Sequence, residues 1–216
     1  MKLLLLWLLP LLSYFPAVGP PAARVTFSPL TKAAYLAAKK MAVLTKPVMT
    51  FPVKKARGRI VIPTTVGNLV FTDRVTADDE TQFITHKYLG FMPILKEHLL
   101  ETIYWEGADY TLIESDGNKT KLISPPNYSP NQQYIITSSR GLVYGMMPNG
   151  IQLFIRKNGH PTLVWKLIPI HWEPAEAFWA SDSIAYLKEE RVSFNEYREA
   201  VPYKPARFAY VKLVVH

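Results

Sequence analysis

Apolar and polar residues alternate over residues 102–139, and this alternation predicts a run of short β-strands. Ile103 and Trp105 alternate with polar neighbours in the first of them. Residues 116–118 (Asp-Gly-Asn) tolerate a positive φ and lie between two β-rich stretches, so they predict a hairpin turn. The segment therefore favours antiparallel strands joined by tight turns.

The same signals continue on both sides of this segment. Residues 60–66 and 69–72 flank a Gly-Asn dipeptide, which is typical of a two-residue hairpin loop at 67–68. A proline turn at 129–132 precedes another expected strand at 134–138. Residues 92–101 are compatible with a helix or with a turn followed by a strand, and we expect the turn and strand.

The chain ends in a stretch that predicts a closing strand. Within residues 208–215 one face is continuously apolar, while Phe208, Tyr210 and Lys212 lie on the other. Its expected partner is the segment around 184–187 or the one at 60–62. The preceding residues, 195–205, contain two prolines and several charges and predict a loop.

The strand pattern also repeats along the chain. The turn at 116–118 has a counterpart in Asn-Gly-His at 158–160, and Ser129-Pro130 before a strand has one in Glu173-Pro174. A period of about 40 to 45 residues with four short strands is typical of propeller blades. The run SPNQQYIITSS at 129–139 resembles the blades of TolB-like and WD-repeat propellers, and the resemblance covers about residues 69–190.

This resemblance implies a scaffold for binding, with no activity attached. Closed propellers use about four to eight blades, whereas the sequence shows two clear units and one fainter unit. We therefore expect an all-β fold of repeated antiparallel hairpins, arranged as an open propeller-like stack or, alternatively, as a compact sandwich or barrel.

Composition limits the chain to one cored domain with an extension, because it has 216 residues of which 49% are hydrophobic. The single all-β domain is expected at residues 60–216. The chain has no cysteine, which excludes disulfides, thiol nucleophiles and the common cysteine zinc sites.

Residues 1–23 are expected to be a secretory signal peptide. Lys2 precedes an apolar run over residues 3–12, and the small residues Ala17, Gly19, Ala22 and Ala23 offer cleavage positions. An uncleaved anchor is the alternative. Export without cysteine fits a bacterial periplasm or exterior better than a eukaryotic secretory lumen, so we expect an extracytoplasmic protein.

Residues 24–59 form a basic arm with a short helix. The arm holds nine basic residues and no acidic one, and subtracting these nine and Lys2 from the net charge of +8 leaves −2 for residues 60–216. Ser28 followed by Pro29 predicts the start of the helix. Its expected apolar stripe consists of Leu30, Ala34, Ala37, Met41 and Leu44.

Two interpretations of this arm stay open. In the first it binds an anionic membrane surface or an envelope polyanion, and in the second it is a solvated linker whose helix packs on the domain. Nucleic acid is not an expected partner, because no recognition motif accompanies the charge. The first interpretation assigns anionic-surface binding to Lys32, Lys39, Lys40, Lys54, Lys55 and Arg57.

No motif in the sequence carries a specific chemistry. The five histidines are not in ligand pairs of recognised spacing, so neither a metal nor a cofactor is predicted. Residues 138–141 lack the glycine elbow of a nucleophilic serine, and the acidic triplet at 78–80 predicts a solvated turn. Candidate ligand-binding residues are acids and aromatic side chains: Trp105, Glu106, Asp109, Tyr110 and Trp172.

These features favour an exported, non-catalytic β-rich protein that acts as a binding or structural module of the cell envelope. Its expected partner is an envelope polyanion, an anionic membrane surface or a glycan. The alternative is a cryptic glycosidase-like hydrolase, in which carboxylates flank a sugar beside aromatic rings. The acids available for that chemistry are Glu106, Asp109, Glu173 and Glu176.

Overall fold

The computed structural model describes residues 24–42, 47–75, 82–143, 145 and 147–216. Strands account for 57% and helix for 6%, which confirms the all-β prediction. The elements in chain order are β1 (Val25–Leu30), α1 (Lys32–Met41), β2 (Arg59–Thr64), β3 (Gly67–Thr72), β4 (Ile84–Met92), β5 (Glu97–Tyr104), β6 (Gly107–Glu114), β7 (Lys119–Leu122), β8 (Asn127–Tyr128), β9 (Tyr134–Ser139), β10 (Gly150–Lys157), β11 (His160–Leu167), β12 (Trp172–Trp179), β13 (Ile184–Phe194), β14 (Ala200–Pro202) and β15 (Phe208–Val215).

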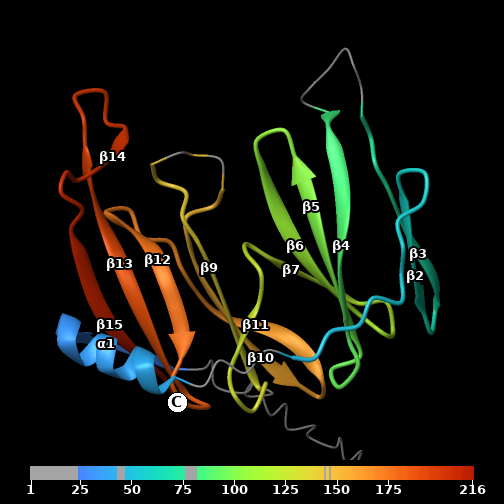
Figure 1. Cartoon of the computed structure of the whole chain (residues 1–216), viewed down its shortest axis with the longest axis horizontal. Coiled ribbons are helices and arrows are strands. Elements are labelled where there is room, and N and C mark those ends of the chain that lie inside the picture. Colours follow the sequence, from blue (N-terminus) through green and yellow to red (C-terminus); the bar gives the residue numbers. More distant parts are fainter. Residues whose placement is uncertain (1–23, 43–46, 76–81, 144, 146) are drawn as a thin grey trace, which may run out of the picture.

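The strands form antiparallel sheets that stand side by side (Figure 1). A four-stranded meander, β4-β5-β6-β7, is followed by a second sheet with the order β11-β10-β9-β8. The last sheet has the order β1-β15-β13-β12, with β14 paired to β13, and the hairpin β2-β3 lies at the other end of the stack. No barrel closes among the described residues, so the structure shows the open stack of blade-like sheets.

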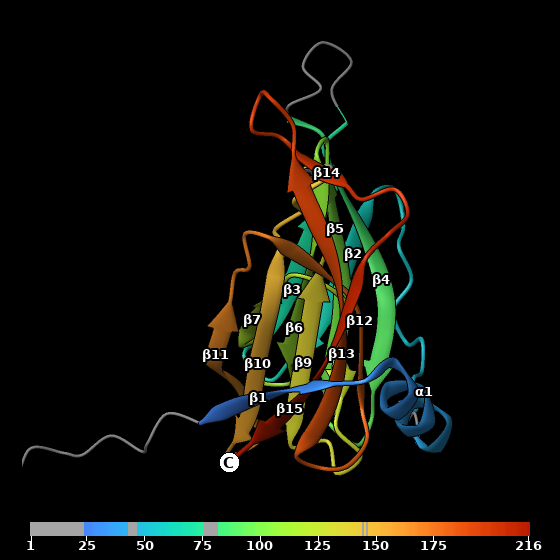
Figure 2. The same ribbon diagram turned by 90° about the vertical axis from the view of Figure 1, so that its left-hand side faces the viewer.

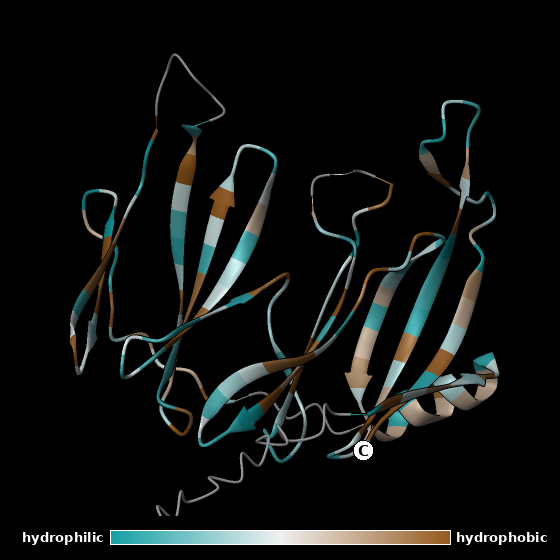
Figure 3. Ribbon diagram, turned by 180° about the vertical axis from the view of Figure 1, so that it is seen from behind, coloured by the Kyte–Doolittle hydropathy of each residue, from teal (hydrophilic) through white to brown (hydrophobic). Residues whose placement is uncertain are grey.

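Each gap between neighbouring sheets holds its own apolar core. The first core joins β2 to the β4–β7 sheet, the second joins that sheet to β8–β11, and the third joins β8–β11 to the last sheet. Alternate residues of a strand point to opposite faces, so a strand in the middle of the stack supplies both neighbouring cores. Figure 3 shows the resulting bands of hydrophobic and hydrophilic residues along the strands. The buried members are Ile60, Ile62, Leu100 and Ile113 in the first core; Met92, Leu99, Leu112, Leu122, Tyr128, Ile135 and Phe154 in the second; and Ile136, Ile151, Leu153, Trp179, Ala185, Leu187, Val211, Leu213 and Val215 in the third.

The first segment of the basic arm is a strand of the last sheet. β1 pairs antiparallel with β15, from Val25 opposite Val215 to Leu30 opposite Tyr210. Figure 2 shows β1 lying along the edge of β15 beside the C-terminus. β15 has the bounds that the sequence predicts, and its other neighbour is β13, as expected for the segment around 184–187.

The helix begins later than predicted. Ser28 and Pro29 lie inside β1, and the N-cap is Thr31, whose hydroxyl accepts the N–H of Ala34 at 3.2 Å. The structure does not show the expected apolar stripe either, because Ala34, Ala37 and Met41 are exposed. Leu44 lies outside the described residues. Thr31 therefore supplies the N-terminal cap that Ser28 was expected to supply, because residues 25–30 are extended in β1.

Tyr35 attaches α1 to the outer face of the last sheet. The side chain is buried, and its ring lies 4.8 Å from the ring of Tyr210 and 5.4 Å from that of Phe178. The Tyr35 hydroxyl donates to Glu176 Oε2 at 2.8 Å, and Lys39 Nζ donates to Glu176 Oε1 at 2.5 Å. The helix of the arm therefore packs on the domain.

Four turn predictions are confirmed and three others differ. The proline turn at 129–132 precedes β9, and the N–H of Gln132 donates to the Ser129 carbonyl oxygen at 2.8 Å. Hairpin turns follow β6 at 116–118 and β10 at 158–159, and a turn then a strand occupies 93–104. In the β2-β3 hairpin Thr64 pairs with Gly67, so the loop is residues 65–66 rather than 67–68. Glu173 and Pro174 lie within β12 beside a bulge, not in a turn. The expected loop at 195–205 contains β14, because this segment returns to pair with the end of β13.

Residues 1–23 and 78–80 lie outside the part of the chain that the structure describes, so the signal-peptide and solvated-turn predictions stand as made. Within the described part, α1 is the one helix, and no helix has the length and apolar character needed to cross a membrane.

Candidate functional site

The outer face of the β4–β7 sheet is only half covered. Its lower half, with Leu100 and Ile113, packs against Ile60 and Ile62 of β2, and all four side chains are fully buried. Over the upper half, the end of β3 and Arg74 face the sheet across a space instead of packing into this core. A cavity of about 340 Å³ opens there, lined by Phe71, Thr72, Arg74, Ile84, His86, Thr102, Tyr104, Asp109, Thr111, Lys119 and Lys121.

Strand register places the polar groups of this cavity in a row. His86 of β4 pairs with Thr102 of β5, which pairs with Asp109 of β6, so the three side chains share one face. His86 Nδ1 lies 3.2 Å from the Thr102 hydroxyl oxygen. The regular pairing of three strands therefore builds a polar floor for the cavity.

Asp109 is held by two neighbours. Its Oδ2 accepts a hydrogen bond from the Tyr104 hydroxyl at 2.9 Å and one from Lys121 Nζ at 3.4 Å. Burial, together with the hydrogen bond to Asp109, raises the pKa of Tyr104 to about 12, so its hydroxyl stays protonated and donates. The carboxylate is thus occupied by donors of the protein itself.

The start of β4 is fixed by an ion pair below the cavity. Asp73 accepts the backbone N–H of His86 at 2.8 Å and pairs with Lys55, and Lys55 also donates to the His86 carbonyl oxygen at 2.9 Å. Burial alone would raise the pKa of Asp73, but the hydrogen bonds from Lys55 and His86 lower it overall. Burial lowers the pKa of the His86 imidazole, which favours its neutral form.

Cations and aromatic rings surround this polar floor. Arg74, Lys119 and Lys121 line the cavity, and Asp109 is the one carboxylate among its lining residues. Lys119 Nζ lies 5.1 Å from the centre of the Phe71 ring, whose edge contact with His86 is 5.4 Å between ring centres. The arrangement suits an anionic ligand with hydroxyl groups and an apolar face.

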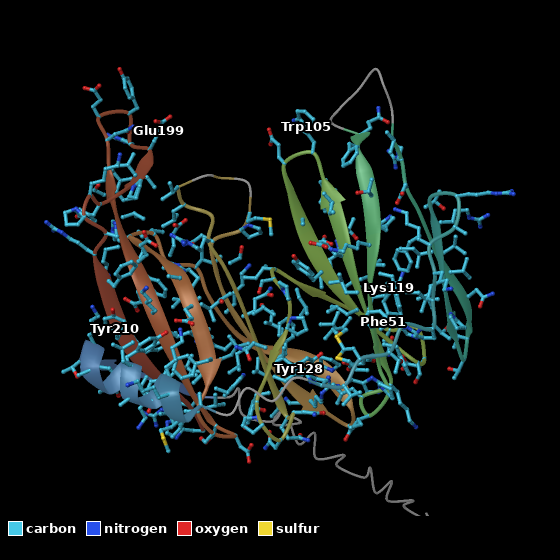
Figure 4. All side chains as sticks on the ribbon, in the orientation of Figure 1. Phe51, Trp105, Lys119, Tyr128, Glu199 and Tyr210 are labelled. Carbon is cyan, nitrogen blue, oxygen red and sulfur yellow. The ribbon has the colours of Figure 1, made fainter. Side chains whose placement is uncertain are left out.

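The structure separates the predicted ligand-binding residues. Trp105, which is 51% exposed, and Glu106 form the tip of the β5-β6 hairpin, next in the chain to Tyr104 (Figure 4). Tyr110 lies on the opposite face from Asp109, where its hydroxyl donates to Glu101 at 2.8 Å. Trp172 belongs to β12 and packs against the third core.

The acids named for a hydrolase are also apart. Glu173 is buried in the last sheet and accepts the backbone N–H groups of Leu142 and Val143 at 2.6 and 3.1 Å. Glu176 faces α1, Asp109 faces the cavity, and Glu106 is exposed at a hairpin tip. The structure brings no two of these four carboxylates together in one of the described cavities.

The predicted anionic-surface residues fall into two groups at opposite ends of the stack (Figure 1). Lys32, Lys39 and Lys40 lie on α1. Lys54 and Arg57 line a shallow cavity of about 500 Å³ beside β2, while Lys55 is engaged with Asp73.

Sequence reasoning found one of the residues that line the cavity, Asp109. A usable signal exists for several others, because His86, Thr102, Thr111 and Lys121 are polar residues at strand positions that face the same way as buried Leu100 and Ile113. Where a buried apolar face of a sheet continues into polar residues, that part of the face is expected not to be packed in an apolar core. Neither a family model, nor a curated protein, nor a solved structure matches this chain.

Proposed function

We propose that this chain is an exported, non-catalytic binding protein of the cell envelope, and that the cavity on the β4–β7 sheet holds an acidic saccharide. The observation that carries the proposal is a cavity floor of aligned polar side chains with three cations and one engaged carboxylate around it. Ligand sites are typically concave, with few polar groups that converge on the ligand.

The chemistry of the lining matches a carboxylated sugar. Lys121, Lys119 and Arg74 supply charge-assisted donors for a carboxylate. The Phe71 and Tyr104 rings supply apolar faces, and the hydroxyls of Thr102 and Thr111 supply neutral hydrogen bonds. A neutral sugar would leave the excess positive charge of the cavity unpaired.

A hydrolytic role is not favoured by this arrangement. Glycoside hydrolysis uses two carboxyl groups about 5 to 9.5 Å apart, one as an acid and one as a base or nucleophile. Asp109 has no second carboxylate beside it among the residues that line the cavity. The site supports binding without bond cleavage.

Calorimetric titration tests the binding proposal with a matched pair of ligands, oligogalacturonate and its fully methyl-esterified form. We expect the acidic oligosaccharide to bind and the neutral ester to bind at least tenfold more weakly, with affinity falling as salt screens the charges. Lys121→Ala should weaken the acidic ligand by about tenfold, the effect of losing one charge-assisted hydrogen bond.

Lys87→Ala is the matched control, because Lys87 lies on the other face of β4 and its side chain is largely exposed. It should bind the acidic ligand as the unmodified protein does. Equal losses in Lys87→Ala and Lys121→Ala, or no binding of oligogalacturonate, alginate or hyaluronate oligomers, would contradict the assigned site.

Export is tested separately by the mass of the native protein. A cleaved signal peptide predicts a mature chain that begins between about residues 18 and 26 and fractionates outside the cytoplasm. Recovery of the full-length chain from the cytosol would overturn export, whereas its recovery from membranes would indicate a retained anchor.

A further inference from the structure

Two hairpin turns from different sheets meet at one point of the stack. Glu114 ends β6 and Asp116 lies in the turn to β7, while His160 follows the Asn158-Gly159 turn and begins β11. His160 Nδ1 lies 2.5 Å from Glu114 Oε2 and 4.0 Å from Asp116 Oδ2. One ligand atom from each of the three residues lies within 4.8 Å of the others.

Glu114 carries an unexplained buried charge. The residue is 6% exposed, and its Oε1 is fully buried without a hydrogen-bond partner. Its other oxygen contacts His160, so the unpaired oxygen belongs to a carboxylate that already points into the cluster. An unpaired buried carboxylate oxygen is costly, which indicates that the site is built for a further partner.

The surrounding charges have the sign that a cation requires. Glu97 lies directly opposite Glu114 on β5 and is also buried. Arg156 binds both oxygens of Glu97, at 2.5 and 2.7 Å, so its guanidinium is occupied. Three carboxylates therefore share this region with one guanidinium, which leaves two negative charges to be balanced by the His160 imidazole or by a bound cation.

The turn that carries the acids is firmly held. Asp116 accepts the backbone N–H of Asn118 at 3.0 Å and the side-chain amide of Asn118 at 2.7 Å. The carbonyl oxygen of the preceding residue, Ser115, accepts the N–H of Thr65 from the β2-β3 turn at 2.7 Å. The His160 side chain is half exposed, so water has access to complete a coordination sphere.

We propose that Glu114, Asp116 and His160 bind one divalent transition-metal cation, of which Zn²⁺ is the representative probe. One imidazole nitrogen and two carboxylate oxygens with an open fourth position suit zinc or manganese, whereas calcium and magnesium prefer oxygen ligands alone. Ligand atoms around tetrahedral zinc lie about 3.3 Å apart. The exposed imidazole therefore shifts by about 1 Å and releases its shared proton as the metal enters.

Such an ion would link two neighbouring sheets. Glu114 and Asp116 come from the β4–β7 sheet, and His160 comes from the β8–β11 sheet. A ligand that binds the folded chain and not the unfolded chain raises the melting temperature in a concentration-dependent way. The sequence predicts no metal ligands here because they come from two separate turns, so no single spacing displays them.

Titration of the chelator-treated full-length protein with ZnCl₂ tests the proposal by calorimetry and thermal melting together. We expect one Zn²⁺ per chain, a raised melting temperature, and a Zn²⁺-dependent shift of the His160 imidazole signals in NMR. His160→Ala and Glu114→Gln should each weaken Zn²⁺ binding by tenfold or more and abolish the thermal shift.

His171→Ala is the matched control, because His171 is an exposed histidine just before β12 and away from the cluster. It should keep the full thermal shift. The proposal is overturned if micromolar Zn²⁺ produces no shift in the unmodified protein, or if His160→Ala and His171→Ala respond alike; the cluster is then a histidine–carboxylate ion pair only. Oligosaccharide binding at Lys121 is measured on another face of the sheet, so the two proposals fail independently.

Discussion

The β4–β7 and β8–β11 sheets are both four-stranded and antiparallel, and each contains a hairpin with a tight glycine turn, yet they differ in what covers them. In the middle sheet, neighbouring residues of β9 are both buried: Ile135 joins the second core and Ile136 the third. In the outer sheet, Leu112 and Ile113 of β6 also join different cores, but the face that carries Ile113 continues into the polar cavity at Asp109 and Thr111.

This difference shows that the place of a sheet in the stack decides whether it can bind a ligand. The middle sheet has a four-stranded sheet on one face and the five-stranded last sheet on the other, so both faces are covered. Among the described residues, the far face of the outer sheet is covered by the two-stranded β2-β3 hairpin and by Val53, and the polar cavity opens beside them. An open face with polar side chains is the result.

The joint between these two sheets should show the largest effect on stability. Arg156→Met removes the guanidinium that binds both oxygens of Glu97, whose side chain is 1% exposed. We expect a loss of about 3 to 5 kcal/mol, because a buried carboxylate is left unpaired. Urea unfolding in the presence of a chelator measures it. The double variant Glu97→Leu with Arg156→Met should recover most of the loss; no recovery would mean that Arg156 acts through other contacts.

The next largest effect is expected from alanine substitutions at pairs of adjacent strand residues, and the two sheets should respond differently. On β9 of the middle sheet, Ile135→Ala and Ile136→Ala should each cost about 2 to 5 kcal/mol, since each leaves a cavity in a different core. On β7 of the outer sheet, Leu122→Ala should cost a similar amount, whereas Lys121→Ala should stay within about 0.5 kcal/mol. Denaturant midpoints decide this, and a costly Lys121→Ala would show that the outer face is part of the core.

The outer face of the last sheet is covered by α1 instead of by another sheet, and Tyr35 makes the main contact. Tyr35→Phe keeps the ring between Phe178 and Tyr210 but removes the hydroxyl that donates to Glu176. We expect a loss of about 1 kcal/mol, the usual net value of one hydrogen bond. Thermal unfolding measures it, with the exposed Leu36→Ala as a surface control on the same helix. A loss as large as that of a core cavity would indicate that the hydroxyl fixes the docking of α1.

Low pH should weaken the contact of Glu176 with Tyr35 and Lys39, and the loss of stability should be smaller than that of Tyr35→Phe. Burial alone would raise the pKa of Glu176, but hydrogen bonds from Lys39 and Tyr35 lower it overall. A carboxyl whose folded pKa is lowered stabilises the fold above its unfolded pKa of about 4.3, and this contribution is lost as pH falls from there through the folded pKa. We expect less than about 1 kcal/mol, because solvent screens the pair. Glu176→Gln should lose less stability than the unmodified protein between about pH 5 and 3; parallel pH curves would contradict the lowered pKa.

Local sequence determined the strands and most of their turns. The glycine turns after β6 and β10 and the alternating face of β15 were predictable, because period-two patterning and positive-φ turn residues act over a few neighbouring positions. The β2-β3 loop at 65–66 was not, since moving a hairpin loop by two residues keeps every side chain on the same face.

Tertiary structure alone decided which surfaces are free and which residues meet. β1 became a strand because the edge of β15 offers unpaired backbone groups, which no local feature of residues 25–30 reveals. The cavity at Asp109 exists because a two-stranded hairpin covers a four-stranded sheet, and the Glu114–Asp116–His160 cluster exists because two turns from different sheets converge. Contacts of this kind depend on how far each sheet extends and what stacks on it, and these properties belong to the folded chain rather than to any segment of its sequence.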